Sequence, residues 1–521
     1  MNWKKGMSIT LSGILLSTAV AGCSTKTETG AAGGGDAAAQ AVNAPPPKLK
    51  VAVVNNEGYV VASANINEDK YVQKMRELSK TDVKFELINS NEKEKQITLM
   101  FAGGDLPDLI QAVGINSAEL APAVDAGALT DLKPLLEKYG PNIMKNTPKE
   151  AWTGPEVYKD GKIYGIPLLN FNDQGRITLL RKDWLDKLGL QVPKTVDEFI
   201  EVLKAFRDKD PNGNGKKDEI PYTGREALLY AETFMNAYDV TPNTFKFENG
   251  QMVPGFIRPQ MKQALELYKM MYQEKLLDND VFLNKTKDTD TKIKGSGLVG
   301  MFVTGADGID KLAADLKKNV PGAEIIPVAA PLGPDGKGGS FKRSIISATT
   351  WVIPSTNKNP ENAIKFLDWF YTPEAQKLVL YGLEGVDHTV ENGKISYKVP
   401  STNEETTRES MHLNWMRFLG PSHVLNKEFM QLRPFGDLVM QAMEIATKEG
   451  RKNDAEGMPY LPAMQKNPDL YYKGLFIEFA AKVMTGKEPV ENFDKFVEDF
   501  KKRGGDELIK EGTEWYNKNT K

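Results

Sequence analysis

The sequence predicts an α/β protein with two lobes and a helical C-terminal portion. Three observations lead to this prediction. Segments typical of buried strands alternate with amphipathic segments from residue 48 onward, a second unit of this kind starts near residue 176, and 521 residues are too many for one hydrophobic core. Such alternation is typical of a parallel sheet that helices cover on both faces.

The first lobe opens with the apolar segment KLKVAVVNN. The predicted elements, in order, are strand 48–56, helix 67–80, strand 83–89, helix 91–104 and strand 106–113. Ligands of parallel sheets bind at the carboxyl ends of the strands. The loops Asn55–Tyr59 and Ile110–Asn116, with Tyr59 and Gln111, are therefore candidate parts of a ligand site. Further along, Asp160-Gly161 between two apolar runs predicts a hairpin.

The second unit covers residues 176–210 and combines a strand, a short helix and a capped helix. Thr195 and Glu198 have the spacing of a capping box, and the apolar residues that follow form one helix face. Strands are predicted again at 295–304 and 323–332. Residues 360–385 are predicted to form two helices that break at Thr372-Pro373, and the last third is mostly helical.

The N-terminus is typical of a secreted protein. Lys4 and Lys5 precede an apolar stretch, and the small residues Val20-Ala21-Gly22 precede Cys23, which is the single cysteine of the chain. This pattern is similar to a bacterial lipobox, so we expect a signal peptide over 1–22 and acyl chains on Cys23. Each buried methylene adds about 0.8 kcal/mol, so two or three chains anchor a protein firmly. The alternative is an ordinary signal peptide with an incidental cysteine.

Residues 23–48 are rich in Gly, Ala, Ser, Thr and Pro. A segment of this composition cannot bury apolar surface and is expected to form a flexible linker. The sequence therefore predicts a protein that is held on the extracellular face of the cell membrane through its lipid anchor.

The segment DPNGNGKKDEIP, residues 210–221, has the pattern of a calcium-binding loop. Oxygen-bearing side chains stand at alternate positions and glycine stands at position 6. The predicted ligands are Asp210, Asn212, Asn214, Lys216 through its backbone carbonyl, Asp218 and Glu219. Pro221 at position 12 cannot supply the usual carboxylate, and Glu219 is the substitute. The alternative is a solvated Asn-Gly turn. A single loop without a second copy favours a structural role over sensing.

Composition and motifs argue against several other classes. A net charge of −3 lacks the basic excess of a nucleic-acid-binding protein. His388, His412 and His423 have no metal-ligand spacing, and the sequence contains no nucleophile elbow or P-loop. We therefore expect a protein that is not an enzyme.

Aromatic residues in predicted loops or strand ends are candidates for stacking on sugar rings. They are Tyr59, Trp152, Phe171, Tyr230, Trp351, Tyr381 and Trp415. Arg343 is a candidate partner for an acidic sugar. For any single aromatic residue, packing in the core is the alternative interpretation.

The mature chain resembles the extracellular solute-binding lipoproteins of ABC importers, in the branch that binds oligosaccharides. The segments that carry this resemblance are FAGGDLPDLI, YKDGKIYGIP, LLRKDWLDKLGL, PKTVDEF, DPNGNGKKDEIP, ENAIKFLDWFYTPEAQKL, YGLEGVDH and EPVENFDKFV. The calcium loop is similar to that of alginate-oligosaccharide-binding proteins. There the residues that correspond to Asp210, Asn212, Asn214, Lys216, Asp218 and Glu219 bind the ion.

The resemblance implies a type II periplasmic-binding-protein fold with a hinge between two α/β lobes. Lobe 1 would contain 49–171 and 350–410, and lobe 2 would contain 172–349 and 411–521, with the chain crossing near Phe171–Arg176, near Ser347–Trp351 and within 395–425. The implied ligand is an oligosaccharide, and the implied partner is the membrane permease of an ABC importer. The protein is expected to be a monomer that binds no nucleic acid. Two alternatives stay open: a cell-surface polysaccharide-degrading enzyme with a structural calcium loop, and the same fold binding a peptide or another non-sugar solute.

Overall fold

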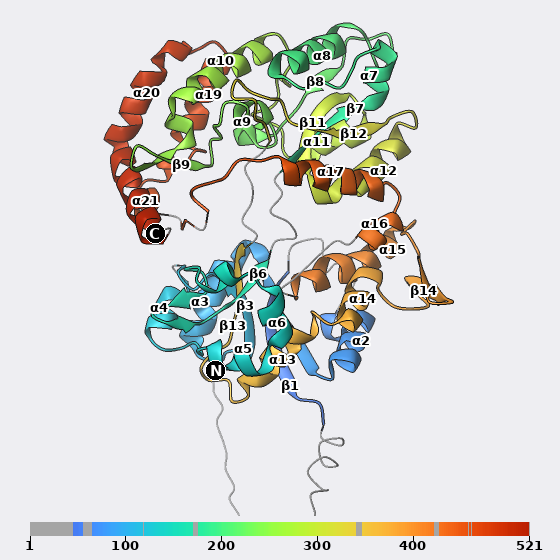
Figure 1. Ribbon diagram of the computed structural model, residues 1–521, viewed down its shortest axis with the longest axis vertical. Helices are drawn as coiled ribbons and strands as arrows, with labels where there is room; N and C mark the ends of the chain where they lie inside the picture. The colour runs from blue at the N-terminus through green and yellow to red at the C-terminus, as the bar shows by residue number, and fades with distance from the viewer. Residues whose placement is uncertain are drawn as a thin grey trace, which may run out of the picture. The chain divides into compact units, whose positions relative to one another are not determined.

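The structure is a computed structural model that describes residues 45–55, 65–117, 119–169, 176–339, 346–420, 427–456, 458–459 and 461–519. Residues Pro47–Lys521 form one compact unit. This unit contains a five-stranded sheet and a four-stranded sheet, each with its own helices (Figure 1). The structure therefore confirms the predicted α/β class.

The first sheet is assembled from two distant parts of the chain. Its strands, in spatial order, are β2 (Asp82–Asn89), β1 (Lys48–Asn55), β3 (Leu109–Val113), β13 (Ile346–Val352) and β6 (Ile166–Leu169). β1 is parallel to β2 and β3, whereas β13 is antiparallel to both of its neighbours. The predicted parallel arrangement is thus confirmed for the first three strands and wrong for β13. The local sequence pattern did not give the direction of β13, because this strand is distant in the sequence from its partners.

The second sheet is also mixed. Its strands, in order, are β12 (Ile325–Val328), β7 (Arg176–Arg181), β11 (Val299–Gly305) and β8 (Ile220–Tyr222). β8 is parallel to β11, and β7 is antiparallel to both β11 and β12. The carboxyl ends of β8 and β11 therefore meet the start of β7 at one edge of the sheet.

Helices pack against both sheets. Those of the first sheet are α2 (Lys70–Ser79), α3 (Lys93–Gly103), α4 (Ala121–Asp125), α5 (Lys133–Tyr139), α6 (Pro141–Asn146), α13 (Pro360–Trp369) and α14 (Pro373–Tyr381). Those of the second are α7 (Lys182–Leu188), α8 (Val196–Asp208), α9 (Thr233–Asn236), α10 (Pro259–Gln273), α12 (Ile309–Asn319), α16 (Lys427–Gln431), α17 (Gly436–Lys448), α18 (Pro462–Lys466), α19 (Leu475–Met484), α20 (Phe493–Phe500) and α21 (Asp506–Asn519). The helical C-terminal portion thus extends the core of the second sheet.

Local sequence signals explain several of these elements. α8 starts with the predicted capping box, in which Thr195 accepts from the Glu198 N–H and the Glu198 carboxylate accepts from the Thr195 N–H. Asp160-Gly161 turns the hairpin between β4 (Tyr158–Lys159) and β5 (Lys162–Ile163), and both turn residues have positive φ. Two more hairpins pair β9 (Phe245–Glu248) with β10 (Gln251–Pro254) and β14 (His388–Glu391) with β15 (Lys394–Tyr397).

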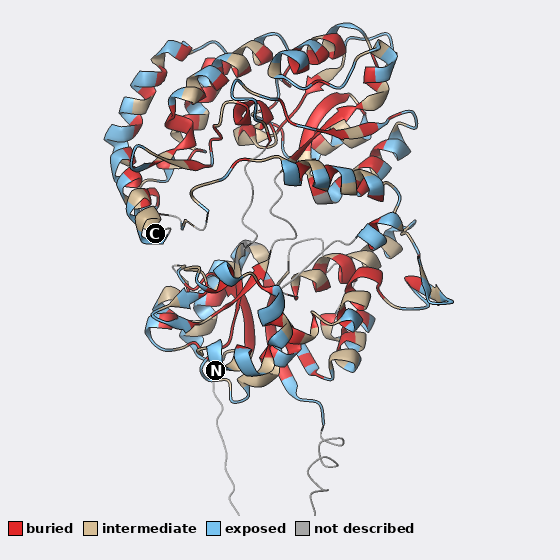
Figure 2. Cartoon of the chain, in the orientation of Figure 1, coloured by how far each residue is buried: buried red, intermediate tan, exposed pale blue. Residues whose placement is uncertain are grey.

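Strand residues point alternately into two different cores. Val51 and Val53 of β1 belong to one apolar cluster, and Ala52 between them belongs to another. Leu179 and Leu180 of β7 separate in the same way. Both sheets are accordingly buried, and the helices around them carry one buried face each (Figure 2).

The chain passes between the two sheets three times. It leaves the first sheet after Leu169 and enters the second at Arg176, and it returns between Val328 and Ile346. The second crossing was predicted at Ser347–Trp351, but these residues lie within β13. The predicted boundary at residue 410 is also too early, because the segment containing Met411, Trp415 and Leu419 packs in the core of the first sheet.

An arginine connects helix α12 to a helix that directly precedes the core segment 411–419 of the first sheet. Arg433, between α16 and α17, donates to Asp310 of α12 over 2.7 Å. It also pairs with Glu409 of α15 (Asn403–Glu409), which accepts from the Tyr397 hydroxyl over 2.7 Å. The Arg433, Asp310 and Glu409 side chains are each less than 15% exposed. Buried charges need partners of this kind to offset their desolvation.

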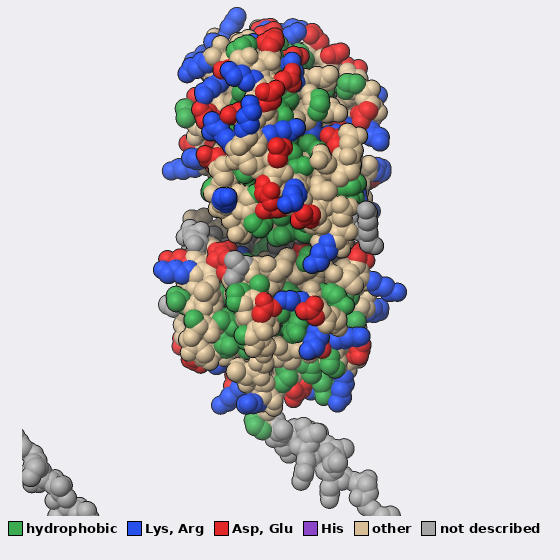
Figure 3. Space-filling view, turned by 90° about the vertical axis from the view of Figure 1, so that its left-hand side faces the viewer, with side chains coloured by type: hydrophobic (Ala, Val, Ile, Leu, Met, Phe, Trp, Pro, Cys, Tyr) green, Lys and Arg blue, Asp and Glu red, His purple; other side chains and the backbone are tan. Residues whose placement is uncertain are grey.

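The surface carries charges of both signs. Figure 3 shows Lys and Arg interspersed with Asp and Glu over the coloured part of the face in view, as the net charge of −3 implies. Among the described helices, none has the length and apolar character that crossing a membrane requires.

Candidate functional site

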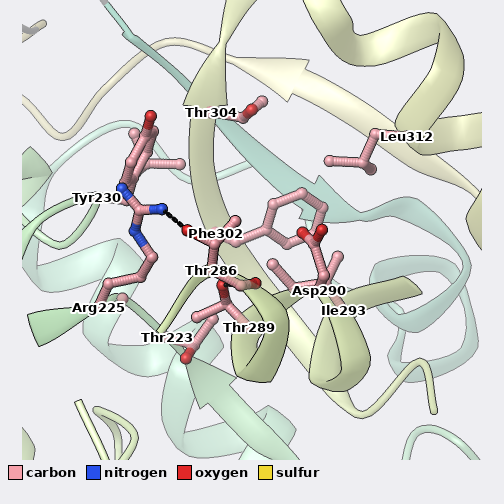
Figure 4. Close-up of a pocket in the computed structure, with 12 residues that line it drawn as sticks. Thr223, Arg225, Tyr230, Thr286, Thr289, Asp290, Ile293, Phe302, Thr304 and Leu312 are labelled. Atoms are coloured by element: carbon pink, nitrogen blue, oxygen red, sulfur yellow. Dashed lines mark hydrogen bonds between the residues drawn. The ribbon is translucent and has the colours of Figure 1, made fainter. Parts of the chain in front are cut away.

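A pocket of about 180 Å³ lies at the edge of the second sheet where β8 and β11 end. β8 is followed at once by Thr223, Gly224 and Arg225, and Thr304 lies next to the last residue of β11. Helix α11 (Thr286–Asp290) closes another side. The lining residues are Thr223, Gly224, Arg225, Tyr230, Thr286, Thr289, Asp290, Ile293, Phe302, Val303, Thr304 and Leu312 (Figure 4). This is the edge at which α/β sheets bind ligands.

The pocket combines hydroxyl groups with an apolar floor. Thr223, Thr286, Thr289 and Thr304 contribute four hydroxyl oxygens, and Ile293, Phe302, Val303 and Leu312 contribute apolar surface. A threonine hydroxyl that already donates still has lone pairs to accept with. No histidine or cysteine lines this pocket. The lining is therefore suited to holding a polyhydroxylated molecule by hydrogen bonds and apolar contact.

Tyr230 is contacted by two guanidinium groups. The Arg176 Cζ lies 3.8 Å and the Arg225 Cζ 4.4 Å from the centroid of the Tyr230 ring. Cation–π contacts of this kind stabilise by about 0.5–2 kcal/mol each, depending on solvent exposure. Since the guanidinium groups occupy the ring, Tyr230 positions the arginines and is not free to stack on a sugar as the sequence predicted.

The backbone around Tyr230 is held in an unfavourable conformation. Ala227, Leu228 and Tyr230 have φ of 57°, 57° and 60°, a region that side chains with a β-carbon rarely adopt. Two hydrogen bonds hold the loop: the Arg225 N–H donates to the Leu229 carbonyl over 2.8 Å, and the Glu226 N–H donates to the Asn284 carbonyl over 3.1 Å. Strain of about 1–3 kcal/mol per residue is a feature of ligand-binding positions.

The charged groups beside Tyr230 differ in their partners. Arg176 forms an ion pair with Glu232, and burial raises the pKa of Glu232 against the opposing effect of Arg176. Arg225 donates through Nη1 to the Thr286 hydroxyl, while its Nε is buried without a hydrogen-bond partner. Figure 4 shows the Arg225 side chain between Tyr230 and Thr286. The sequence analysis did not identify Arg176, Arg225 or Glu232 as site residues, although Arg225 stands four residues after the ion loop 210–221.

Four of the predicted ligand-binding residues lie in the cores instead. Trp351 and Trp415 are 0% and 1% exposed within the core of the first sheet, so their assignment to a ligand surface is wrong. Trp152 is buried in the same core, and Tyr381 is buried in the cluster beneath the second sheet. Aromatic side chains bury large areas, and here that tendency prevailed.

Gln111 also has a structural role. Its Oε1 accepts from the Val54 N–H over 3.0 Å and its Nε2 donates to the Phe418 carbonyl over 2.9 Å. The prediction that Gln111 binds ligand is therefore wrong in this structure, because both ends of the amide are taken. Tyr59, Phe171, Arg343 and Cys23 lie outside the described residues.

The predicted ion loop precedes β8 and closes on itself through Asp210. This carboxylate accepts from the N–H groups of Gly213, Asn214 and Gly215 over 2.9–3.1 Å. Desolvation opposes them, yet these donors lower the pKa of Asp210. Gly215 at position 6 has φ of 76°, which glycine adopts without strain. The side-chain amide of Asn214 donates to Asp218 over 3.0 Å.

Glu219 is the feature of this loop that fits a cation. Both of its carboxylate oxygens are buried without a hydrogen-bond partner. Burial, together with the charges of Asp210 and Asp218, raises the pKa of Glu219. Within the described residues, no three His, Cys, Asp or Glu side chains are grouped closely enough to hold a metal. The donor set fits calcium chemically, and its oxygens are here held by the loop itself.

Comparisons with known proteins give a consistent result. The profile of the family described as bacterial extracellular solute-binding protein matches residues 63–377. The polygalacturonan/rhamnogalacturonan-binding protein YtcQ of Bacillus subtilis (strain 168) is 27% identical over 463 residues, covering 85% of this chain and 87% of that protein. The fructooligosaccharide ABC transporter substrate-binding protein FusA of Streptococcus pneumoniae serotype 4 is 28% identical over 337 residues, covering 59% and 58%.

The fold also has solved neighbours. The crystal structure of the alginate-binding protein AlgQ2 without calcium ion superimposes with a TM-score of 0.65 at 22% identity, covering 91% of this chain and 99% of that one. At this level of identity, the likeness concerns the fold alone.

Proposed function

The chain belongs to the bacterial extracellular solute-binding protein family, and we propose that it captures an oligosaccharide outside the cell for import by an ABC transporter. The relatives YtcQ and FusA are named for binding polysaccharide or oligosaccharide. Such a protein binds its ligand and releases it chemically unchanged.

The observation that carries this proposal is the pocket at the end of β8 and β11. Four threonines and Arg225 line this cavity together with apolar side chains. The Thr223 and Thr289 hydroxyls donate to protein oxygens, so they meet a ligand only as acceptors. Sugars present hydroxyl groups around their rim and C–H groups on their faces, so both parts of the lining have a use. The strained loop that carries Tyr230 keeps the Arg225 guanidinium in place before the ligand arrives, which lowers the entropy cost of binding.

Capture proceeds by closure of two lobes built on the two sheets. The three passages of the chain between the sheets act as the hinge. A ligand that contacts both lobes only in the closed state shifts the population toward that state. The lobe built on the second sheet contacts the ligand through the pocket. The Arg176–Glu232 pair fixes the start of β7 beside this pocket.

We assign a structural calcium ion to the loop 210–221. Its ligands are Asp210, Asn212, Asn214, the Lys216 carbonyl, Asp218 and Glu219, with Glu219 replacing the carboxylate that position 12 lacks. The unpartnered oxygens of Glu219 support this assignment, because a dication offsets the repulsion among three neighbouring carboxylates. The ion stabilises the beginning of β8, at the opposite end of that strand from the pocket.

The lipobox around Cys23 supports an acyl anchor in the outer face of the membrane. The linker up to residue 48 then keeps the binding unit near the permease and raises its effective concentration there. Loaded, closed protein docks on the permease, and the protein acts as a monomer.

The test is a titration with a panel of oligosaccharides, followed by calorimetry, thermal unfolding and product analysis. Saturable binding that raises the melting temperature, with the sugar recovered intact, supports the proposal. Release of shorter sugars on prolonged incubation would identify a polysaccharide-degrading enzyme instead. Binding of peptides but of no sugar would keep the fold and change the ligand.

A further inference from the structure

Of the two charged residues that line the pocket, Asp290 has an ion-pair partner and Arg225 has none among the described residues. Three carboxylates each face a cation: Glu232 faces Arg176, Glu226 faces Lys285 and Asp290 faces Lys294. The Arg225 side chain has no such partner among the described residues, and the hydrogen bond that it donates goes to the neutral hydroxyl of Thr286. The pocket therefore retains one uncompensated positive charge.

The guanidinium of Arg225 is also held in position. It lies over the Tyr230 ring, with its Cζ 4.4 Å from the ring centroid, and Nη1 is fixed by Thr286. Its Nε is buried and donates to no acceptor. A buried N–H without an acceptor costs free energy, and a ligand that supplies the acceptor recovers this cost. A planar guanidinium offers its donors as a fork that fits the two oxygens of a carboxylate.

From these observations we infer that Arg225 recognises the carboxylate of a hexuronic acid, so that the ligand is an acidic oligosaccharide. This inference rests on the proposed function and narrows it to one class of sugar. Tyr230 and Thr286 act as positioning residues that hold the guanidinium over the cavity. The threonine hydroxyls bind the sugar hydroxyl groups, and Arg225 distinguishes the acidic sugar from its neutral counterpart.

Arg176 is the matched contrast within the same cluster. It contacts the same tyrosine ring at 3.8 Å, but its charge is offset by Glu232. A ligand carboxylate would have to displace Glu232 from Arg176, whereas at Arg225 there is no carboxylate to displace. The selectivity for acid is therefore assigned to Arg225 alone.

The experiment compares acidic sugars with their own methyl esters, which keep the shape and remove the charge. The probes are trisaccharides of galacturonate and of mannuronate, their methyl esters, and a sulfated galactose trisaccharide, each titrated by calorimetry. Wild-type protein is compared with Arg225→Gln, Arg225→Lys and, as a control, Arg503→Gln, which removes an exposed arginine on the far C-terminal helices.

We expect wild-type protein to bind at least one acid about 10- to 100-fold more tightly than its methyl ester. Arg225→Gln should bind acid and ester equally, with the affinity for the ester changed less than threefold. Arg225→Lys should keep part of the preference, because it retains the charge without the fork. Arg503→Gln should behave as wild type. The preference should also weaken as salt is raised.

The outcomes separate this inference from the proposed function. Tight binding of neutral sugars or esters, unaffected by Arg225→Gln, would overturn the inference and leave oligosaccharide capture standing. An Arg225-dependent preference for the sulfated sugar over both uronates would overturn the assignment to carboxylate. Binding of no sugar by folded wild-type protein would overturn the proposed function as well. Thermal unfolding of each variant shows that the fold is retained.

Discussion

The two sheets use their polar and aromatic side chains differently. At the first sheet, Gln111 is satisfied by the chain's own backbone and Trp351 is fully buried. At the second, Arg225 has a buried nitrogen without an acceptor, and Tyr230 is held at a positive φ. In the first sheet these side chains stabilise the fold, whereas beside the second sheet Arg225 keeps a donor that a ligand can use.

The largest expected effect on stability comes from the first sheet, where Trp351 is buried in the core. Trp351→Ala should lower the free energy of unfolding by about 3–5 kcal/mol, because it leaves a cavity in a closed core. Urea denaturation measures this loss. Trp369→Ala is the control, since that side chain is only partly buried at the margin of the same core, and it should cost less than half as much. Equal costs would contradict the assignment of Trp351 to the interior.

Calcium removal tests the end of β8 that lies away from the pocket. With calcium about 100-fold above its dissociation constant, the bound ion adds about 2.7 kcal/mol to the stability of the native state. A chelator should therefore lower the melting temperature, and Glu219→Gln should reduce that response. Affinity for sugar at 25 °C should change less than threefold, because the loop and the pocket lie at opposite ends of β8. An unchanged melting temperature would rule out the ion.

Tyr230→Ala should weaken ligand binding more than it weakens the fold. Loss of the ring frees Arg225 and should reduce the affinity for acidic sugar about three- to tenfold, the equivalent of ~1 kcal/mol of cation–π contact. Tyr158→Ala, at an exposed tyrosine, should leave the affinity unchanged. Calorimetry provides both values. If Tyr230→Ala lowers the melting temperature and leaves the affinity unaltered, Tyr230 has a structural role like that of Trp351.

The smallest effect is a pH dependence at Glu449, whose carboxylate accepts from the Ala330 N–H just after β12. Burial raises the pKa of Glu449 to about 7, and the Ala330 donor only partly opposes this. A raised carboxyl pKa means that the folded state holds the proton more tightly than the unfolded one. The stability contributed is therefore full below the usual pKa and is lost as the pH rises through about 7.

Glu449→Gln removes this titration, and its stability relative to the wild type should increase as the pH rises from 5 to 8. The expected gain is about 1–2 °C in melting temperature at pH 8, with the two proteins equal at pH 5. A constant difference at every pH would show that the carboxyl group ionises normally.

Much of the fold could be predicted because its signals are local. The capping box of Thr195 and Glu198 and the turn at Asp160-Gly161 each depend on a few neighbouring residues. The direction of β13 could not be predicted in this way, because its partners β3 and β6 are about 180 or more residues away in the sequence. Strand direction over such a separation depends on tertiary packing.

The site was less predictable than the fold. The ion loop is a continuous motif, so its residues could be identified together. The pocket draws Arg225, Thr286 and Thr304 from three separate segments, and no spacing in the sequence relates them. Burial also removed Trp351 and Trp415 from consideration, since the aromatic character that suits a sugar suits a core equally well.

The order of strands in the first sheet has a consequence for how the protein is made. Among the described strands β6 pairs with β13 alone, and β13 begins at Ile346, so β6 must wait until about 180 further residues have been synthesised and exported. Meanwhile β7, β8, β11 and β12 are all available to form the second sheet. A strand from the first third of the chain is thus among the last to complete its pairing, and a chaperone outside the membrane would find its unpaired edge exposed during that interval.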